Sequence, residues 1–224
     1  MPHPSVTEAL PRLLDELATR SLTATFFVEA INCERNPEAV QSIAQRGHEV
    51  AHHGWQHEQW SALEATEERN ILSTGVNAFA MLGLRVTGFR PPGGELTARS
   101  PALLAETGFE WCSPAGSAPN PAGALEYIPF EWEMVDAYHL MERFGPLRKR
   151  RKDHPDVLDP PAVGQRFEAA IDRLATREGR CTLVMHPFLM LDDRWFDCVR
   201  ALLDRMSELA AEGHLAVVPG NKIG

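Results

Sequence analysis

Short apolar segments alternate with amphipathic helical segments along most of the chain, and this alternation limits the folds it can adopt. The segments predicted as strands are short, apolar and bounded by turn residues: 22–28, 48–51, 86–89, 109–112, 125–129, 181–185 and 214–218. The segments predicted as helices carry apolar residues every three or four positions: 6–20, 37–45, 61–82, 97–107, 163–176 and 195–211. Because helices link successive strands, the strands are expected to run mostly parallel, which predicts an α/β fold.

Length and charge narrow the class of protein further. A chain of 224 residues with 44% hydrophobic and 24% charged residues suits one globular domain, so we predict a single domain over 1–224. The net charge of −9 argues against a nucleic-acid partner, because phosphate contacts need Lys and Arg. The basic run 148–152 falls in a segment, 136–161, without clear periodicity. We predict that this segment is a long loop and that the basic run is solvated.

The first residues and the spacing of the cysteines indicate the cellular compartment. Residues 1–6 lack the basic and apolar regions of a signal peptide, and no segment is apolar over a membrane-spanning length. The four cysteines have no C-x-x-C spacing, which is typical of reduced thiols. We therefore expect a cytoplasmic protein with no membrane partner.

A histidine-rich segment, 47–58, follows one predicted strand. If Gly54 opens a helix, His53 and His57 lie one turn apart on the same face, where both imidazoles can reach one divalent ion. The alternative is a solvated helix start with a histidine packed in the core. Trp55, within the same segment, could line a sugar-binding or ring-binding groove, although most buried tryptophans belong to the core.

Other polar residues also follow predicted strands. Arg90 precedes two prolines that fix a rigid turn, where its guanidinium can bind a carboxylate or carbonyl of a substrate or, alternatively, a loop carbonyl. His186 ends an apolar strand just before a proline, and the alternative for it is a core histidine. The carboxyl ends of parallel strands carry the chemistry in barrel folds, so the positions of these residues predict one shared site.

Five segments, 24–28, 47–58, 89–94, 128–136 and 183–187, together resemble the polysaccharide deacetylase family, also called carbohydrate esterase family 4 or the NodB-homology domain. They are most similar to its intracellular peptidoglycan-deacetylase-like and allantoinase-like branch. The resemblance implies a distorted (β/α) barrel of about seven parallel strands. The family's first strand, which ends in paired aspartates, has no counterpart here, so the resemblance implies an N-terminally truncated domain. An open seam would then need a cover, which favours a homo-oligomer.

The resemblance also implies roles for individual residues. His53 and His57 would bind a divalent metal, most naturally zinc, without the family's aspartate ligand. His186 would be the general acid, and Asp136 would orient it. Arg90 matches an arginine that holds the family's catalytic aspartate. For the substrate groove we name Trp55, Tyr138 and Gly94.

Three functions follow as alternatives. The first is a hydrolase of carbon–nitrogen bonds other than peptide bonds, which deacylates an N-acylated sugar or a similar amide with the help of a metal. The second is a metal-independent hydrolase of small cyclic amides, similar to allantoinase. The third is a catalytically silent or truncated relative that only binds its ligand. The expected partner is a small molecule or a glycan.

Overall fold

The computed structural model describes residues 2–116 and 125–223, so part of the connection between the predicted strands 109–112 and 125–129 lies outside the described residues. The chain divides into two compact units. We call 23–129 together with 218–224 the sheet unit, and 1–22 together with 130–217 the helical unit. In the described part of the chain, no helix combines the length and apolar character that a bilayer span requires.

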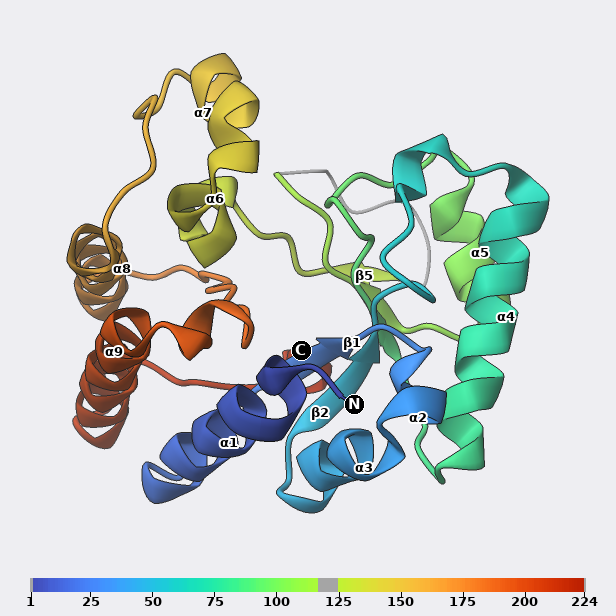
Figure 1. The fold of residues 1–224 in the computed structure, drawn as a ribbon, viewed down its shortest axis with the longest axis horizontal. Coiled ribbons are helices and arrows are strands. Elements are labelled where there is room, and N and C mark those ends of the chain that lie inside the picture. Colours follow the sequence, from blue (N-terminus) through green and yellow to red (C-terminus); the bar gives the residue numbers. More distant parts are fainter. Residues whose placement is uncertain (1, 117–124, 224) are drawn as a thin grey trace. The chain divides into compact units, whose positions relative to one another are not determined.

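The sheet unit is an α/β structure, as predicted. Its strands are β1 (Thr25–Val28), β2 (Glu49–His52), β3 (Gly88–Phe89), β4 (Trp111–Cys112) and β5 (Glu126–Tyr127). They form one parallel sheet in chain order (Figure 1). The helices around it are α2 (Asn32–Arg35), α3 (Pro37–Gln45), α4 (Ala65–Met81) and α5 (Ser100–Thr107), with short 3-10 turns at Trp60–Ala62 and Gly220–Lys222. Chain order and parallel pairing place the carboxyl ends of all five strands at one edge.

The helical unit consists of packed helices: α1 (Leu10–Thr19), α6 (Asp136–Leu140), α7 (Gly145–Arg151), α8 (Pro160–Ala175) and α9 (Asp193–Ala211). A short π-helix at Ser5–Ala9 precedes α1, and 3-10 turns lie at Trp132–Met134, Glu142–Phe144 and Leu189–Leu191. Helices α8 and α9 pack along their apolar faces, which bury Phe167 and Val199. An isolated parallel bridge joins Val135 to Val184.

Three sequence predictions for the second half of the chain were wrong in detail. The strand predicted over 181–185 is reduced to the single bridge at Val184, and 214–218 is not a strand. The long loop predicted over 136–161 contains α6 and α7. An apolar run becomes a strand only where a neighbouring strand offers backbone hydrogen bonds. The sequence of the run does not show whether such a neighbour exists.

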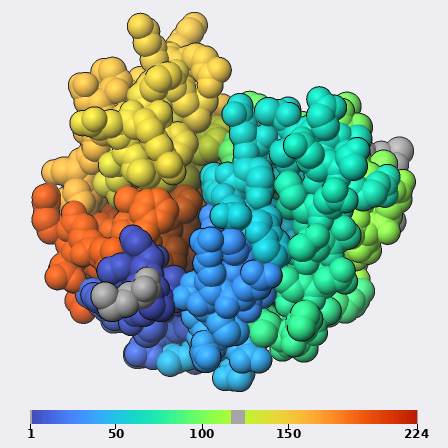
Figure 2. Space-filling view, turned by 45° about the vertical axis from the view of Figure 1, so that its right-hand side comes forward, coloured from blue at the N-terminus to red at the C-terminus, as the bar shows by residue number. Residues whose placement is uncertain are grey.

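The basic run is largely exposed, as predicted, but differs from its prediction in two respects. Its first four residues lie on α7 instead of a loop, and Lys152 caps this helix, which is yellow at the molecular surface in Figure 2. Arg148 is nevertheless 1% exposed, and its guanidinium donates hydrogen bonds to the carbonyls of Tyr138 and Met141. Arg151 forms ion pairs with Glu131 and Glu133. Two cations of the run therefore hold the unit together instead of facing only water.

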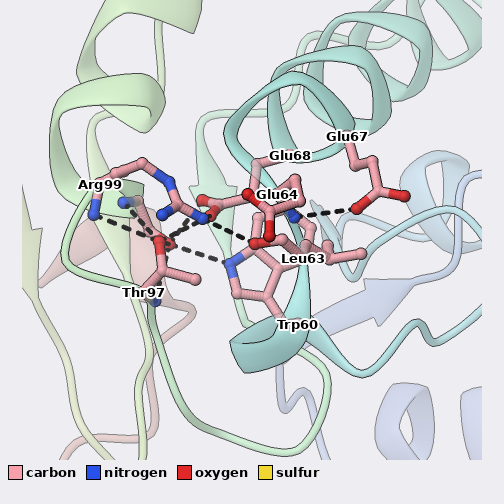
Figure 3. Close-up of polar contacts among 8 residues, drawn as sticks. Trp60, Leu63, Glu64, Glu67, Glu68, Thr97 and Arg99 are labelled. Atoms are coloured by element: carbon pink, nitrogen blue, oxygen red, sulfur yellow. Dashed lines mark hydrogen bonds and ion pairs between the residues drawn. The ribbon is translucent and has the colours of Figure 1, made fainter.

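A buried carboxylate connects α4 to the start of α5 (Figure 3). Glu68 accepts hydrogen bonds from Thr97 Oγ1 at 2.6 Å, Arg99 Nη2 at 3.0 Å and Ser100 Oγ at 2.9 Å. The Trp60 indole donates to the same Ser100 hydroxyl at 3.0 Å. Both carboxylate oxygens therefore have partners, which is the condition under which a buried charge is tolerated.

His52, at the end of β2, is fully buried against α4. A Cβ on Gly75 of α4 would lie 1.8 Å from His52 Nε2, so only glycine leaves room for the ring. Burial lowers the pKa of His52 to about 3, and the ring is neutral near pH 7. This histidine belongs to the core and lies next in the chain to the predicted ligand His53.

Candidate functional site

The segment with the two predicted metal ligands is a turn, not the helix assumed from the sequence. Gly54 and His57 both have positive φ angles, of 72° and 61°. The carboxylate of Glu58 accepts hydrogen bonds from the backbone N–H groups of Trp55 and Gln56, at 2.9 Å and 2.8 Å. The turn brings the rings of His53 and His57 to a centroid distance of 5.0 Å. The pair predicted from its spacing therefore does form, through a different backbone.

The tautomer of His53 follows from its hydrogen bond. His53 Nδ1 lies 2.8 Å from the backbone oxygen of Arg90, which can only accept, so Nδ1 carries the proton. In the neutral ring the lone pair is then on Nε2. A backbone carbonyl on the remote nitrogen is a common arrangement for histidines that bind metals. His57 is exposed.

Glu29, which the sequence analysis did not select, lies directly after β1. The parallel register pairs Val28 with His52, so the residues that follow, Glu29 and His53, leave neighbouring strands at the same edge. Burial raises the pKa of Glu29, and the nearby His57 partly offsets that rise. The signal was present in the sequence as an acid directly after a predicted strand.

The two histidines fit a divalent ion as a pair, but their ligand set is incomplete. A catalytic zinc site has three protein ligands. Among the described residues, the only group of three or more His, Cys, Asp or Glu whose ligand atoms lie within 4.8 Å of one another is in the helical unit, and it includes neither His53 nor His57. The described part of the sheet unit therefore offers the two histidines without a third ligand at that range.

Arg90 is buried at the end of β3. Its Nη2 and Nε donate to Ser113 Oγ at 2.9 Å and 3.3 Å, and its guanidinium carbon lies 3.9 Å from the ring centroid of Phe27. Burial lowers the pKa of Arg90. The side chain is thus held by the sheet edge, while its backbone oxygen orients His53.

The predicted substrate residues of the sheet unit lie on the loops of this edge. Trp55 is half-buried within the histidine turn. Gly94 has a φ of 83°, and its carbonyl accepts a hydrogen bond from Ala115 N–H at 2.8 Å. Gly94 also lines an open pocket of about 360 Å³ together with Pro114 and Tyr127.

The helical unit brings Asp136 and His186 together, fifty positions apart in the chain. His186 Nδ1 lies 2.5 Å from Asp136 Oδ1, and the backbone N–H of His186 donates to Asp136 Oδ2 at 2.7 Å. The Asp136 side chain is 0% exposed, whereas that of His186 is 31% exposed. The bridge between Val135 and Val184 sets this register. A buried carboxylate therefore directs its charge at a histidine that solvent can reach.

Tyr138 lies in the core of the helical unit and not on an open face. It is 0% exposed, and its ring packs against Trp132 and His139 at centroid distances of 6.3 Å and 5.0 Å. Burial and the carboxylates of Asp153 and Glu133 raise the pKa of Tyr138 to about 12. This position favours a packing role over the predicted contact with substrate.

Comparison with known proteins finds a match to a family model in the first part of the chain. Residues 2–112 match the polysaccharide deacetylase family. A peptidoglycan-N-acetylglucosamine deacetylase of Bacillus cereus is 33% identical over 90 residues, which are 40% of this chain and 33% of that protein. The peptidoglycan-N-acetylglucosamine deacetylase PgdA of Listeria monocytogenes is 37% identical over 94 residues, which are 42% of this chain and 20% of PgdA. The aligned stretch thus covers a third or less of these two curated relatives.

A solved structure covers more of the chain. The crystal structure of a protein from Mycobacterium smegmatis, assigned as a candidate polysaccharide deacetylase, superposes with a TM-score of 0.81 at 27% identity. The superposition covers 98% of this chain and 76% of that one. The likeness therefore includes the segments that carry Asp136 and His186, beyond the residues that match the family.

Proposed function

We propose that this chain, which contains a polysaccharide deacetylase family domain, is a hydrolase of carbon–nitrogen bonds other than peptide bonds. Its substrate is an N-acylated sugar, as the names of the relatives from Bacillus cereus and Listeria monocytogenes suggest. The reaction adds water across an amide. The acyl carbon gains the hydroxyl and leaves as a carboxylate, the carbon–nitrogen bond breaks, and the nitrogen leaves as an amine after it takes up a proton.

The observation that carries this proposal is the Asp136–His186 pair. An amine is a poor leaving group unless it is protonated as the bond breaks, so the reaction needs a proton donor near the nitrogen. The hydrogen bond to Asp136 fixes the proton on His186 Nδ1 and leaves Nε2 as the atom that can exchange a proton with a substrate. The partial exposure of His186 permits that exchange. His186 is therefore the proposed general acid and Asp136 its positioning residue.

Residues of the sheet unit have proposed roles of their own in the same reaction. A divalent metal, when bound, would polarise the amide carbonyl and activate a water molecule. His53 and His57 are the residues that would hold it, and the tautomer of His53 presents Nε2 for that purpose. Glu29 is the proposed acceptor of the proton from the attacking water, because its raised pKa suits proton transfer better than that of an ordinary surface carboxylate. Arg90 orients His53, and Trp55 and Gly94 contact the sugar.

The experiment is an assay of acetate release by the chelator-stripped chain, with N-acetylglucosamine oligomers and peptidoglycan as substrates, with and without added Zn²⁺. We expect release that depends on Zn²⁺ and is lost in His53→Ala and His57→Ala. His214→Ala is the matched control, since His214 is exposed and lies outside the proposed site. Activity that is the same in the stripped wild type and in both variants would contradict the role of the metal. No acetate release from any of these substrates would contradict the deacetylase proposal itself.

A further inference from the structure

A second histidine pair lies in the helical unit, outside the proposed site. His139, on α6, is buried, and His154, in the connection between α7 and α8, is half-buried. His139 Nδ1 and His154 Nε2 face each other at 2.8 Å. The carboxylate of the neighbouring Asp153 reaches the same place, and the three ligand atoms lie within 4.8 Å of one another.

The hydrogen bonds of the other two ring nitrogens determine the tautomers of the two rings. His139 Nε2 is 2.9 Å from the backbone oxygen of Glu133, and His154 Nδ1 is 2.6 Å from the backbone oxygen of Asp156. Backbone oxygens only accept, so each of these nitrogens carries the proton of a neutral ring. Two neutral imidazoles would then point lone pairs at each other across 2.8 Å. Such a contact is repulsive unless a positive charge lies between the nitrogens.

Asp153 supplies the negative charge that a cation needs. Its Oδ1 accepts the backbone N–H of His154 at 2.8 Å and lies 3.5 Å from Arg166 Nη1. Its Oδ2 is buried, accepts no hydrogen bond of ordinary geometry, and lies 3.9 Å from His154 Nε2. The neighbouring Tyr138 hydroxyl is a neutral donor, so a cation at this place would add a positive charge beside the buried carboxylate.

We infer that His139, His154 and Asp153 bind a divalent transition-metal ion such as Zn²⁺. Two imidazole nitrogens and a carboxylate oxygen are a donor set that zinc accepts, with about 2.0–2.1 Å to each ligand. Two nitrogens bound in this way lie roughly 3.3 Å apart, so a separation of the rings by about half an ångström admits the ion. Each histidine already donates its remote N–H to a backbone carbonyl, as metal-bound histidines do.

The place of this site predicts a structural role. Its ligands come from α6 and from the connection between α7 and α8, which also meet through the hydrogen bond from Leu158 N–H to His139 O at 3.1 Å. A bound ion would cross-link these segments. The site is separate from His53 and His57, and the inference does not depend on the proposed reaction.

The experiment uses the full chain with the first pair removed, His53→Ala/His57→Ala, stripped with chelator and titrated with Zn²⁺ in a calorimeter. We expect one equivalent of zinc to bind and, at about 100 times the dissociation constant, the Tm to rise by about 5–10 °C. Adding His154→Ala, or the isosteric Asp153→Asn, lowers the zinc affinity at least about tenfold. Adding His214→Ala, which removes an exposed histidine, leaves the affinity unchanged.

Two results would overturn the inference. One is a folded His53→Ala/His57→Ala chain, verified by circular dichroism, that binds no zinc or keeps its zinc affinity after His154→Ala and Asp153→Asn. The other is a pair of rings that keeps a shared proton at pH 7 in excess Zn²⁺, seen as imidazolium ¹⁵N shifts for His139 and His154. Zinc-bound Nδ1 of His139 and Nε2 of His154 in the same spectra would support it.

Discussion

Each unit contains a buried carboxylate with several hydrogen bonds, but the partners differ in kind. Glu68 of the sheet unit is bound by Thr97, Arg99 and Ser100, which join α4 to α5. Asp136 of the helical unit is bound by the backbone N–H groups of Ala137 and His186 and by the His186 ring. The partners of Glu68 are two hydroxyls and a guanidinium, whereas the side chain beside Asp136 is an imidazole, which can donate and accept a proton. The first carboxylate therefore stabilises the fold, and the second controls a proton.

The largest expected effect on kcat comes from substituting His186, the partly exposed partner of Asp136. His186→Gln removes the proposed proton donor, so we expect kcat for acetate release to fall about 10²–10⁴-fold, with a small change in KM. Added Zn²⁺ does not restore the rate, because the proton is still missing. A variant that keeps more than about a third of wild-type kcat would exclude His186 as the general acid.

Removal of the structural carboxylate is expected to affect stability alone. Glu68→Ala leaves buried donors without an acceptor, and we expect a loss of roughly 2–4 kcal/mol in urea unfolding, discounted because Arg99 is partly exposed. The control is Glu106→Ala, whose ion pair with Arg69 is exposed on both sides and contributes less than about 1 kcal/mol. At a temperature where both variants are folded, kcat stays at the wild-type value. Equal losses of stability in the two variants would remove the distinction between them.

A milder change at Asp136 tests its positioning role. Asp136→Asn keeps the size of the side chain but removes the charge and the fixed tautomer of His186. We expect kcat to fall roughly 10–100-fold while KM is nearly constant. If stability falls and kcat does not, Asp136 resembles Glu68 in its role.

The smallest expected effect is the pH dependence that comes from the core. The folded-state pKa of His52, about 3, lies below the ordinary value of 6.5, so the unfolded chain binds more protons between these values. The contribution of His52 to the free energy of unfolding is therefore fully present above about pH 6.5. It decreases as pH falls, by about 2 kcal/mol from pH 7 to pH 5. His48 and His139, whose pKa values burial also lowers, add to the same slope. Urea unfolding of His52→Gln should show a shallower slope, and an unchanged slope would rule out His52 as its source.

Much of the fold could be predicted because local patterns determine it. The strands around Phe26 and Val50, and the helices that bury Leu14 and Val199, lie where apolar periodicity predicts them. The strand at 214–218 and the loop at 136–161 could not, since pairing and helix formation there depend on neighbours distant in sequence.

The candidate site shows the same limit. The pairing of Asp136 with His186 and the approach of His53 to His57 agree with expectation, although the second pair forms through a turn instead of a helix. Glu29 and the His139–His154 pair were not predicted from the sequence. The strand register brings Glu29 to the same edge as His53, and the register is not given by the sequence pattern. The tautomers of the second pair depend on backbone carbonyls whose positions the sequence pattern does not give.

The most direct test of the central claim compares acetate release by His186→Gln, Asp136→Asn and the double variant. If Asp136 acts only through the imidazole of His186, the double variant is no slower than His186→Gln, because the carboxylate has nothing left to orient. We predict that equality of kcat. A double variant whose loss equals the product of the two single losses would show that Asp136 acts independently, and would contradict the assignment of the pair as one proton-donating unit.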